Sequence, residues 1–398
     1  MWMRTTPLRR APHPRGVAVG HKQRGTVLIT VIMMVAIAAV IVTDMSYRQK
    51  MDIKRTSALL SRDQAYQYLL GAEEIANWSL VRDLKDDHDG SDPVIADTLG
   101  EPWAQPPQPF PVAGGFIQGR ITDLQGRFNV NSLLASDPKV AQKQRDRLRM
   151  LMDLVGIPSA SDTDVTTPML VERLVDWLDA NQEPTGFDGR EDLDYLTEDP
   201  PYRAANRVLW DLSELMLVAG FTADDIALLA DYVSFLPPDT PLNVNTASAL
   251  VLDAYQLGIP GAQIVEAREQ EDPGNLDGGF RDMKAFNDLL LRVAAQTGGQ
   301  PQNVTADATN PSGEPPALTA QDAANRARGN PQTPVGNFTV SSEFFELAAE
   351  AVINQKPVLM RAVLYRPELE DQADNRNNKQ RFTIKTLARK LEDPLKRV

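Results

Sequence analysis

Residues 25–43 read GTVLITVIMMVAIAAVIVT and contain no charged side chain. At the α-helical rise of about 1.5 Å per residue, this stretch is just long enough to cross roughly 30 Å of hydrocarbon. Its glycine stands before the apolar run, whereas a secretory signal peptide carries small residues after a shorter apolar core. The stretch therefore predicts a membrane-spanning helix that stays on the chain.

The charges before this stretch predict its orientation. Six basic residues and no acidic ones precede Gly25, at Arg4, Arg9, Arg10, Arg15, Lys22 and Arg24. By the positive-inside rule, this asymmetry keeps the amino end in the cytoplasm and places everything after Asp44 on the other side. Two interpretations of the boundary remain open: an uncleaved signal anchor, or a leader that a prepilin-type peptidase removes after the glycine.

The composition of the chain disfavours most catalytic classes. Its 398 residues are 42% apolar, which is enough for two or three packed domains. The chain carries 41 basic and 54 acidic residues, and without the six basic ones before Thr26 the net charge is −19, which disfavours binding to a polyanion. There is no cysteine, and His88 is the single histidine after Gly25, so thiolate, Ser-His-Asp and histidine-rich zinc sites are poorly supplied.

The segment after the apolar run predicts a long helix lying on a sheet. Residues 44–87 keep a helical pattern, and the recurring apolar positions are Tyr66, Leu69, Leu70, Ala76, Leu80 and Leu84. The proline-rich EPWAQPPQPFP at 101–111 ends this pattern. Residues 114–133, GGFIQGRITDLQGRFNVNSL, then predict a strand, a turn at Gln125-Gly126 and a second short strand.

A set of motifs, in a fixed order along the chain, resembles the K-type minor pseudopilins of the type II secretion system. After the Gly25 boundary these motifs are DLQGRFNVNSL, LVDWLDANQEP, REDLDY, PYRAAN, DLSELMLVAGF, PLNVNTASALVL and FTVSSEFFEL. The resemblance implies a structural protein rather than an enzyme. Such a protein is expected at the tip of the periplasmic pseudopilus, where it helps to initiate assembly and to drive export of folded proteins across the outer membrane.

The resemblance also implies where the protein lies and what it contacts. We expect the prepilin peptidase to cut between Gly25 and Thr26, and the new amino terminus to be methylated. The protein would be a single-pass protein of the inner membrane with a periplasmic globular part. Its expected partners are the I- and J-type minor pseudopilins in a tip complex, together with the major and other minor pseudopilins, and no nucleic acid.

The implied fold is α+β, with a long N-terminal transmembrane and amphipathic helix on a pilin-like antiparallel sheet that a large all-helical insertion interrupts. The insertion would be of the helix-hairpin-helix or SAM-like kind. The expected segments are a leader at 1–25, a transmembrane helix at 26–43, its periplasmic continuation at 44–90, the first part of the sheet at 91–135, the inserted helical domain at 136–295, a flexible polar loop at 296–337 and the second part of the sheet at 338–398.

Residue patterns within these segments agree with an insertion. Helical patterns occur at Val140–Leu154, Met169–Leu178, Val208–Ala219, Ala223–Ser234, Ala247–Leu257 and Gln263–Glu271. Residues 296–337 are polar with six prolines, which predicts a mobile loop. Strand patterns return at Asn337–Ser341, Val358–Arg366 and Arg381–Arg389.

An acidic run at 176–199, DWLDANQEPTGFDGREDLDYLTED, is the candidate metal site. It holds nine carboxylates against one base, Arg190, and calcium accepts six to eight oxygen ligands in flexible geometry. The run is not an EF-hand, because the sixth position from Asp179 is Pro184. A solvated acidic loop is the alternative, but K-type pseudopilins are described as binding calcium in this helical domain. The predicted ligands are Asp179, Glu183, Glu191, Asp192 and Asp194.

Two other function classes remain open. Residues 243–269 look like a helix-hairpin-helix, which in a membrane-anchored receptor of a DNA-uptake system would hold a phosphate on hairpin N–H groups. Here Pro260 has no N–H and acidic residues surround Arg268, so a packing hairpin is favoured. A membrane-tethered hydrolase would instead need two carboxylates of different pKa in one cleft.

Thr30 is the fifth residue after the expected cleavage site. Other pilins and pseudopilins have a glutamate there, which the family's assembly model pairs with the terminal ammonium of the neighbouring subunit. A carboxylate inside the bilayer is costly without a partner, and the first subunit of a filament has no earlier subunit to pair with. Thr30 therefore predicts a position at the tip, although an anchor that never polymerises would also lack the glutamate.

Overall fold

The structure, a computed structural model, describes residues 26–89, 94–105, 108–161, 165–270, 275–276, 278–297, 338–367 and 384–392. The predicted leader, including Gly25, lies outside the described residues, as do residues 298–337 of the predicted polar loop and the first three residues of the strand predicted at 381–389. The chain forms two compact units, residues 1–61 and residues 62–398.

Helix α1 spans Thr26–Asp89 and includes the whole predicted membrane span. Among the described residues it is the one helix with the length and composition to cross a membrane, with a mean hydropathy of 2.6 in its most apolar window. All side chains from Val27 to Lys50 are exposed. Such a continuous uncovered apolar surface is typical of a segment that meets lipid or a partner.

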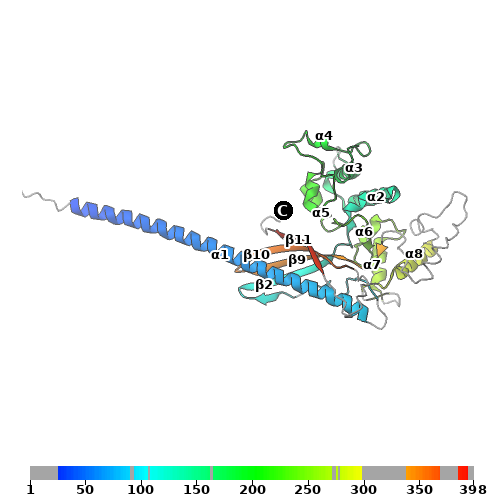
Figure 1. Cartoon of the computed structure of the whole chain (residues 1–398), viewed down its shortest axis with the longest axis horizontal. Coiled ribbons are helices and arrows are strands. Elements are labelled where there is room, and N and C mark those ends of the chain that lie inside the picture. The colour runs from blue at the N-terminus through cyan, green and yellow to red at the C-terminus, as the bar shows by residue number, and fades with distance from the viewer. Residues whose placement is uncertain are drawn as a thin grey trace, which may run out of the picture. The chain divides into compact units, whose positions relative to one another are not determined.

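In the second unit, α1 lies on an antiparallel sheet (Figure 1). The predicted stripe faces this sheet: Leu69, Ala76, Leu80 and Leu84 are buried, and Tyr66 and Leu70 are partly buried. The side chains that cover the stripe from the sheet include Phe345, Leu347, Ala349, Met360, Ala362 and Leu364. Because these residues recur with helical spacing on α1 and with period two on the strands, each element presents one apolar face to the other.

The sheet has five strands in the order β1-β2-β9-β10-β11, and every neighbouring pair is antiparallel. The strands are β1 (Phe110–Val112), β2 (Gly115–Asp123), β9 (Phe344–Ile353), β10 (Lys356–Tyr365) and β11 (Lys385–Glu392). Strand β2 pairs with β9 from Gly115↔Ile353 to Asp123↔Phe345. Since β2 precedes the helical region and β9 follows it, the predicted α+β fold with an interrupted sheet is confirmed.

The central strand β9 is not predicted by the sequence pattern. Its sequence, FFELAAEAVI, is rich in alanine and glutamate, which have low β-propensity. The structure explains these residues by packing, because Ala349 and Ala351 are buried in the core that α1 also lines. Glu346 and Glu350 alternate with these buried residues along β9, so their side chains lie on the other, partly exposed face of the strand.

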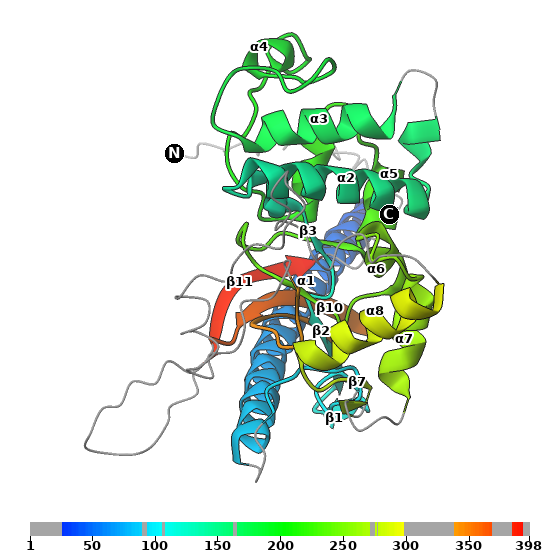
Figure 2. The same ribbon diagram turned by 90° about the vertical axis from the view of Figure 1, so that its right-hand side faces the viewer.

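Helices and short strands fill the region between β2 and β9. The helices are α2 (Pro138–Val155), α3 (Thr167–Leu178), α4 (Asp192–Tyr195), α5 (Ala223–Leu229), α6 (Ala249–Ala254), α7 (Gly261–Glu269) and α8 (Met283–Thr297). The short strands are β3 (Phe128–Asn129), β4 (Val233–Ser234), β5 (Leu242–Asn243), β6 (Asn275–Leu276), β7 (Gly279–Phe280) and β8 (Phe338–Thr339). In Figure 2, α2 lies beside α3; α2 also contacts α6, which contacts α7, and α7 and α8 both contact β7.

Several local predictions for this region are wrong. The helix predicted at 208–219 is a 3₁₀ turn at Leu212–Leu217, which starts after the capping side chain of Asp211. The helix predicted to reach Ser234 ends at Leu229, and Ser234 lies in β4. By contrast, the strand, turn and second short strand predicted at 114–133 are confirmed as β2, residues 124–127 and β3, and β3 pairs in parallel with β4.

A buried polar network joins the inserted region to the sheet. The Asn243 side-chain amide donates to Asp123 Oδ2 at 3.1 Å, to Ser342 Oγ at 2.9 Å and to the Asp97 carbonyl at 3.2 Å. Asn243 is completely buried, and Asp123 ends β2. On burial each of these groups loses its hydrogen bonds to water, and the other groups of the network replace them. The network therefore forms only when the inserted region is in place.

We expect Asn243→Ala to destabilise the protein by about 2 kcal/mol, because it leaves buried acceptors at Asp123, Ser342 and Asp97 with one donor fewer. Thermal unfolding followed by circular dichroism should show a melting temperature lower by roughly 4–8 °C. The control is Gln118→Ala on β2, which removes an exposed hydrogen bond to Glu350 and should shift the melting temperature by about 1–2 °C at most. Equal melting temperatures for Asn243→Ala and the unaltered protein would contradict the proposed role of the network.

Candidate metal centre

The five predicted ligands lie on the segment that follows α3, but the structure does not gather them around one point. Three of them bind neighbouring groups: Asp179 accepts from the Asn181 N–H, Asp192 from the Ala204 N–H and Asp194 from the Glu191 N–H. Glu183 is exposed. Among the described residues, none of the five belongs to a group of three acidic side chains with oxygens within 4.8 Å of one another.

Asp176 and Glu191 are buried carboxylates with oxygens that lack hydrogen-bond donors, as in a cation site without its ion. Asp176 on α3 is completely buried and Glu191 is 4% exposed. One oxygen of Asp176 accepts from the Thr185 N–H at 2.8 Å, but its other oxygen and both oxygens of Glu191 have no hydrogen-bond partner among the residues that the structure describes. Buried carboxylate oxygens without donors are costly, so these three oxygens indicate a missing positive partner.

The electrostatics of Glu191 lead to the same conclusion. Burial, followed by the charges of Asp176 and Asp179, raises the pKa of the Glu191 carboxyl to about 7. Burial also raises the pKa of Asp176. A divalent cation bound to these oxygens would reverse this effect, since it favours the ionised form of both groups.

The backbone of the loop comes close to the same carboxylates. A side chain added at Gly189 would meet Asp176 Oδ2 at 2.2 Å, so the loop backbone passes directly over that oxygen. Glu172 on α3 accepts from the N–H groups of Phe187 and Asp188 at 3.1 and 3.0 Å. The loop is therefore folded back onto α3 by the protein's own groups, while Asp176 Oδ2 and both carboxylate oxygens of Glu191 lack a donor among the described residues.

The unpaired carboxylate oxygens are of the kind that calcium binds, although in the described part of the chain Asp176 and Glu191 belong to no group of three acidic side chains with oxygens within 4.8 Å of one another. Glu191 is one of the five predicted ligands, whereas Asp176 lies in the acidic run but is not among them. One feature of the sequence does point to Asp176: it stands between apolar residues in LVDWL, at a position that α3 buries. An isolated carboxylate in such a position is rarely left without a partner. Calcium binding itself stays a prediction.

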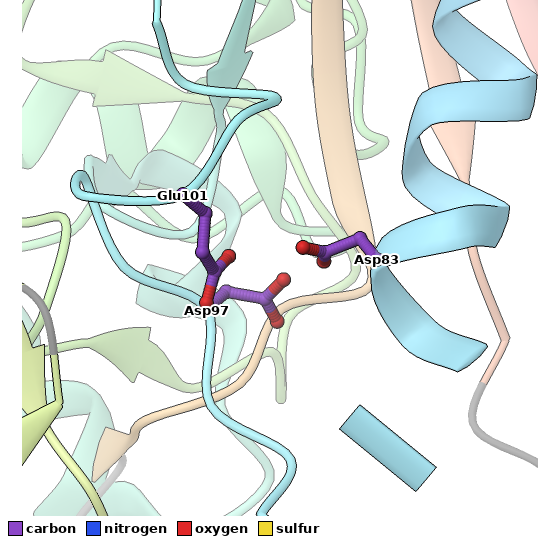
Figure 3. A group of neighbouring side chains, drawn as sticks. All are labelled: Asp83, Asp97 and Glu101. Atoms are coloured by element: carbon purple, nitrogen blue, oxygen red, sulfur yellow. The ribbon is translucent and has the colours of Figure 1, made fainter. Parts of the chain in front are cut away.

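A second acidic cluster consists of Asp83, Asp97 and Glu101, and no sequence motif predicts it (Figure 3). Asp83 belongs to α1, and the other two belong to the segment after it. Their oxygens lie within 4.8 Å of one another. By this geometry alone the cluster resembles a metal site.

The positive charge of the second cluster comes from Arg366, which follows β10. Its guanidinium contacts Asp83 Oδ2 at 3.0 Å and Asp97 Oδ2 at 2.6 Å, and Arg366 is 4% exposed. Burial, followed by the charges of Asp83 and Asp97, raises the pKa of the Glu101 carboxyl to about 9. A carboxyl that holds its proton is a poor calcium ligand, and Arg366 already pairs with Asp83 and Asp97. This cluster therefore joins α1 to the end of β10.

Comparisons with known proteins agree on one family. A family model for the type II secretion system (T2SS), protein K, matches residues 126–238. The type II secretion system protein K of Pseudomonas aeruginosa is 40% identical over 280 residues, which are 69% of this chain and 79% of that protein. The Aeromonas hydrophila protein of the same name is 31% identical over 284 residues, or 68% of this chain and 81% of that protein.

A solved structure has the same fold. In the crystal structure of the GspK-GspI-GspJ complex from enterotoxigenic Escherichia coli, one chain aligns with a TM-score of 0.58 and 23% sequence identity. The alignment covers 85% of this chain and 99% of that chain. At this identity the likeness establishes the fold.

We expect calcium to raise the melting temperature of the full chain in detergent, because an ion at a hundred times its Kd adds about 2.7 kcal/mol to the free energy of unfolding. Asp176→Asn should weaken the calcium response by about tenfold in Kd, roughly a 1.4 kcal/mol loss. Differential scanning calorimetry with and without a chelator measures both effects.

The matched control is Glu183→Gln, which removes an exposed carboxylate from the same loop and should leave the calcium response nearly unchanged. An equal loss in both variants would favour the ligand set predicted from the sequence over the pair in the structure. No calcium response in the unaltered protein would mean that the acidic run is a solvated loop.

The raised pKa of Glu101 predicts a pH dependence of stability. A carboxyl whose pKa is raised on folding contributes stability below its unfolded pKa of about 4.3, and this contribution is lost as the pH rises through about 9. Glu101→Gln should therefore flatten the decline in stability between pH 5 and pH 9 and stabilise the protein at pH 8 by about 1–2 kcal/mol. Urea unfolding in the presence of a chelator measures this difference.

Glu269→Gln, on the exposed end of α7, is the control and should leave the pH profile unchanged. If Glu101→Gln destabilises the protein at pH 8, then Glu101 is ionised in the folded state, contrary to this interpretation.

Proposed function

This chain belongs to the type II secretion system protein K family, and from that premise we propose that it is a minor pseudopilin at the tip of the periplasmic pseudopilus. There it would help to initiate assembly and to drive export of folded proteins across the outer membrane. The observation that carries the proposal is the 40% identity to the Pseudomonas aeruginosa protein over 79% of its length. The resemblance inferred from the sequence motifs is confirmed by the same comparison.

The proposed partners are the I- and J-type minor pseudopilins, followed by the other pseudopilins. The support is the fold shared with a chain from the crystal structure of the GspK-GspI-GspJ complex. The second unit here has the same kind of sheet with helices inserted between β2 and β9. We expect it to bind its partners as a preformed body, because its three hydrophobic clusters are formed within the chain.

The proposed location is the inner membrane, with the amino end in the cytoplasm and the globular part in the periplasm. The support is the exposed apolar surface of α1 from Val27 and the cluster of basic residues before Gly25. We propose that the prepilin peptidase cleaves between Gly25 and Thr26 and that the new amino terminus is methylated. The protein would then retain the whole of α1.

Thr30 supports the proposed tip position. It lies on the exposed part of α1, and its hydroxyl donates to the Val27 carbonyl at 2.9 Å. The side chain is thus satisfied within its own helix and needs no charged partner from another subunit. A first subunit, with no earlier subunit beneath it, requires no more than this.

Calcium is the proposed cofactor, held by Asp176 and Glu191 within the inserted region. It would supply the positive charge that the three unpaired carboxylate oxygens lack. Its proposed role is structural, since Asp176 also anchors the loop through Thr185. We expect the inserted region to keep its fold without calcium and the loop at 179–191 to lose order.

The helix-hairpin-helix alternative is disfavoured by the bonds of the hairpin itself. The Gly261 N–H, at the start of α7, donates to Asp253 Oδ1 at 2.6 Å, so an acidic side chain takes the place that a phosphate would need. Arg268 is 3% exposed and donates to the carbonyls of Val244 and Ala247. The α6–α7 hairpin therefore packs the core rather than presenting donors to DNA.

The absence of enzymatic activity stays a prediction. A hydrolase would need carboxyls of different pKa that substrate can reach. Among the described residues, Asp83, Asp87 and Glu101 have raised pKa values and are partly exposed. Asp97 and Asp123 also have raised pKa values, but their side chains are 0% and 3% exposed and out of a substrate's reach. Their hydrogen bonds to Arg366 and Ser342 give them a structural role.

We expect the soluble portion that begins near Asp44 to form a stable complex with the soluble portions of the I- and J-type pseudopilins of the same organism. Size-exclusion chromatography with light scattering should give one copy of each chain. The complex should not require the membrane span, because the cores of the second unit lie beyond it.

The control is the same mixture with the major pseudopilin in place of the J-type partner, which should not give a stoichiometric complex. Failure of the soluble portion to bind either partner would contradict the proposed tip complex. Labelling that finds this protein repeated along the pseudopilus would contradict its position at the tip.

A further inference from the structure

A group of basic residues follows the apolar part of α1. Arg48, Lys50, Lys54 and Arg55 lie within twelve residues after Thr43. They stand on the side of the span that the positive-inside rule leaves poor in basic residues. They also belong to a chain whose net charge beyond Gly25 is −19. Their position needs a physical reason.

The basic residues fall into two sets on the helix surface. Arg48 pairs with Asp44, with Nε and Oδ2 2.9 Å apart, and Asp52 lies three positions before Arg55. Lys50 and Lys54 are four positions apart on one face, and both are exposed. In the described part of the chain neither lysine forms an ion pair with an acidic side chain.

Tyr47 completes this face. It precedes Lys50 by three positions and is 65% exposed. Tyrosine is enriched at the boundary between hydrocarbon and water, where its ring meets the acyl chains and its hydroxyl meets the headgroups. The order along this face is therefore apolar span, aromatic ring and two lysines.

The spacing along α1 places Tyr47 at headgroup depth, Lys50 just outside it and Lys54 within electrostatic reach of it. At about 1.5 Å per residue, Tyr47 lies roughly 6 Å and Lys50 roughly 10 Å beyond Thr43. The headgroup layer is about 5–7 Å thick on each side, and helical side chains lean toward the amino terminus, which here is toward the membrane. Lys54 lies roughly 16 Å beyond Thr43, so its ammonium comes within about one Debye length of the phosphates.

Removal of the leader would make this face more important. If the chain is cleaved after Gly25 as proposed, the six basic residues on the cytoplasmic side leave with the leader. The terminal ammonium then remains as the single positive group before the span. The strongest positive charge near the membrane is then at Lys50 and Lys54, on the opposite side.

We propose that Tyr47, Lys50 and Lys54 form a lipid-binding face that holds α1 against anionic phospholipid headgroups of the outward-facing leaflet. The face is continuous with the membrane span, and its charge complements the phosphates. It sets the depth of the helix, and it keeps the acidic globular part tethered to a surface that would otherwise repel it.

The test uses the full chain, which has no cysteine, so that a single Met51→Cys substitution carries an environment-sensitive fluorophore. The protein is reconstituted into nanodiscs of phosphatidylcholine alone, or of phosphatidylcholine with one-quarter phosphatidylglycerol. We expect the anionic lipid to reduce quenching of the fluorophore by aqueous acrylamide at least twofold. This protection should be lost in 0.5 M salt.

Lys50→Glu combined with Lys54→Glu should abolish the protection. The control pair, Lys143→Glu with Lys356→Glu, changes the net charge equally at two exposed lysines of the second unit and should keep it. Equal quenching in neutral and anionic nanodiscs would overturn the proposal. Protection that appears in neutral lipid once the partner pseudopilins are added would assign the face to a protein instead.

One outcome separates this inference from the proposed membrane anchoring. If the chain enters both kinds of nanodisc and lipid charge has no effect, anchoring stands and the lipid-binding face is wrong. If the chain enters neither, the anchoring fails, and the lipid-binding face fails with it.

Discussion

The return of the chain to its own sheet is the constraint on which the rest of the second unit depends. Strand β2 pairs with β9, which follows the whole inserted region in the sequence. The loss of chain entropy on closing so long a loop opposes this pairing. The buried network of Asp123, Asn243 and Ser342 lies where the two ends of the insertion meet the sheet. Because these groups satisfy one another only when β2, β5 and β9 are all in place, the network links folding of the inserted region to closure of the sheet.

The features predicted correctly from the sequence are those whose pattern is local. The span before Thr43 and the stripe through Leu69 and Leu80 follow from spacing within one helix. Strand β9 could not be found in this way, since alanines such as Ala349 have a meaning only under the helix that packs on them. The two-residue ladders β3–β4 and β5–β8 join distant segments, and nothing in either strand's own sequence identifies its partner.

The candidate site divides in the same manner. The acidic run makes Glu191 a candidate because its charge density is visible in the sequence. Burial decides which carboxylates lack donors, and burial depends on how α3 packs, so Asp176 emerges only from the structure. The cluster around Arg366 draws on α1, on the segment after it and on the end of β10, so no spacing rule could assemble it.

The two acidic clusters solve one electrostatic problem in different ways. At Asp83 and Asp97 the compensating charge is Arg366, which is covalently part of the chain and present under every condition. At Asp176 and Glu191 no basic side chain of the described residues reaches the unpaired oxygens, and under the proposed calcium binding the compensating charge comes from solution. Stability gained from an ion in solution varies with its concentration, whereas stability gained from an internal arginine does not. The contact between α1 and the sheet is therefore independent of ions. Under the proposed calcium binding, the part of the stability that varies with ion concentration is confined to the loop after α3. Residues 179–191 contribute no side chain to the hydrophobic clusters of the described residues.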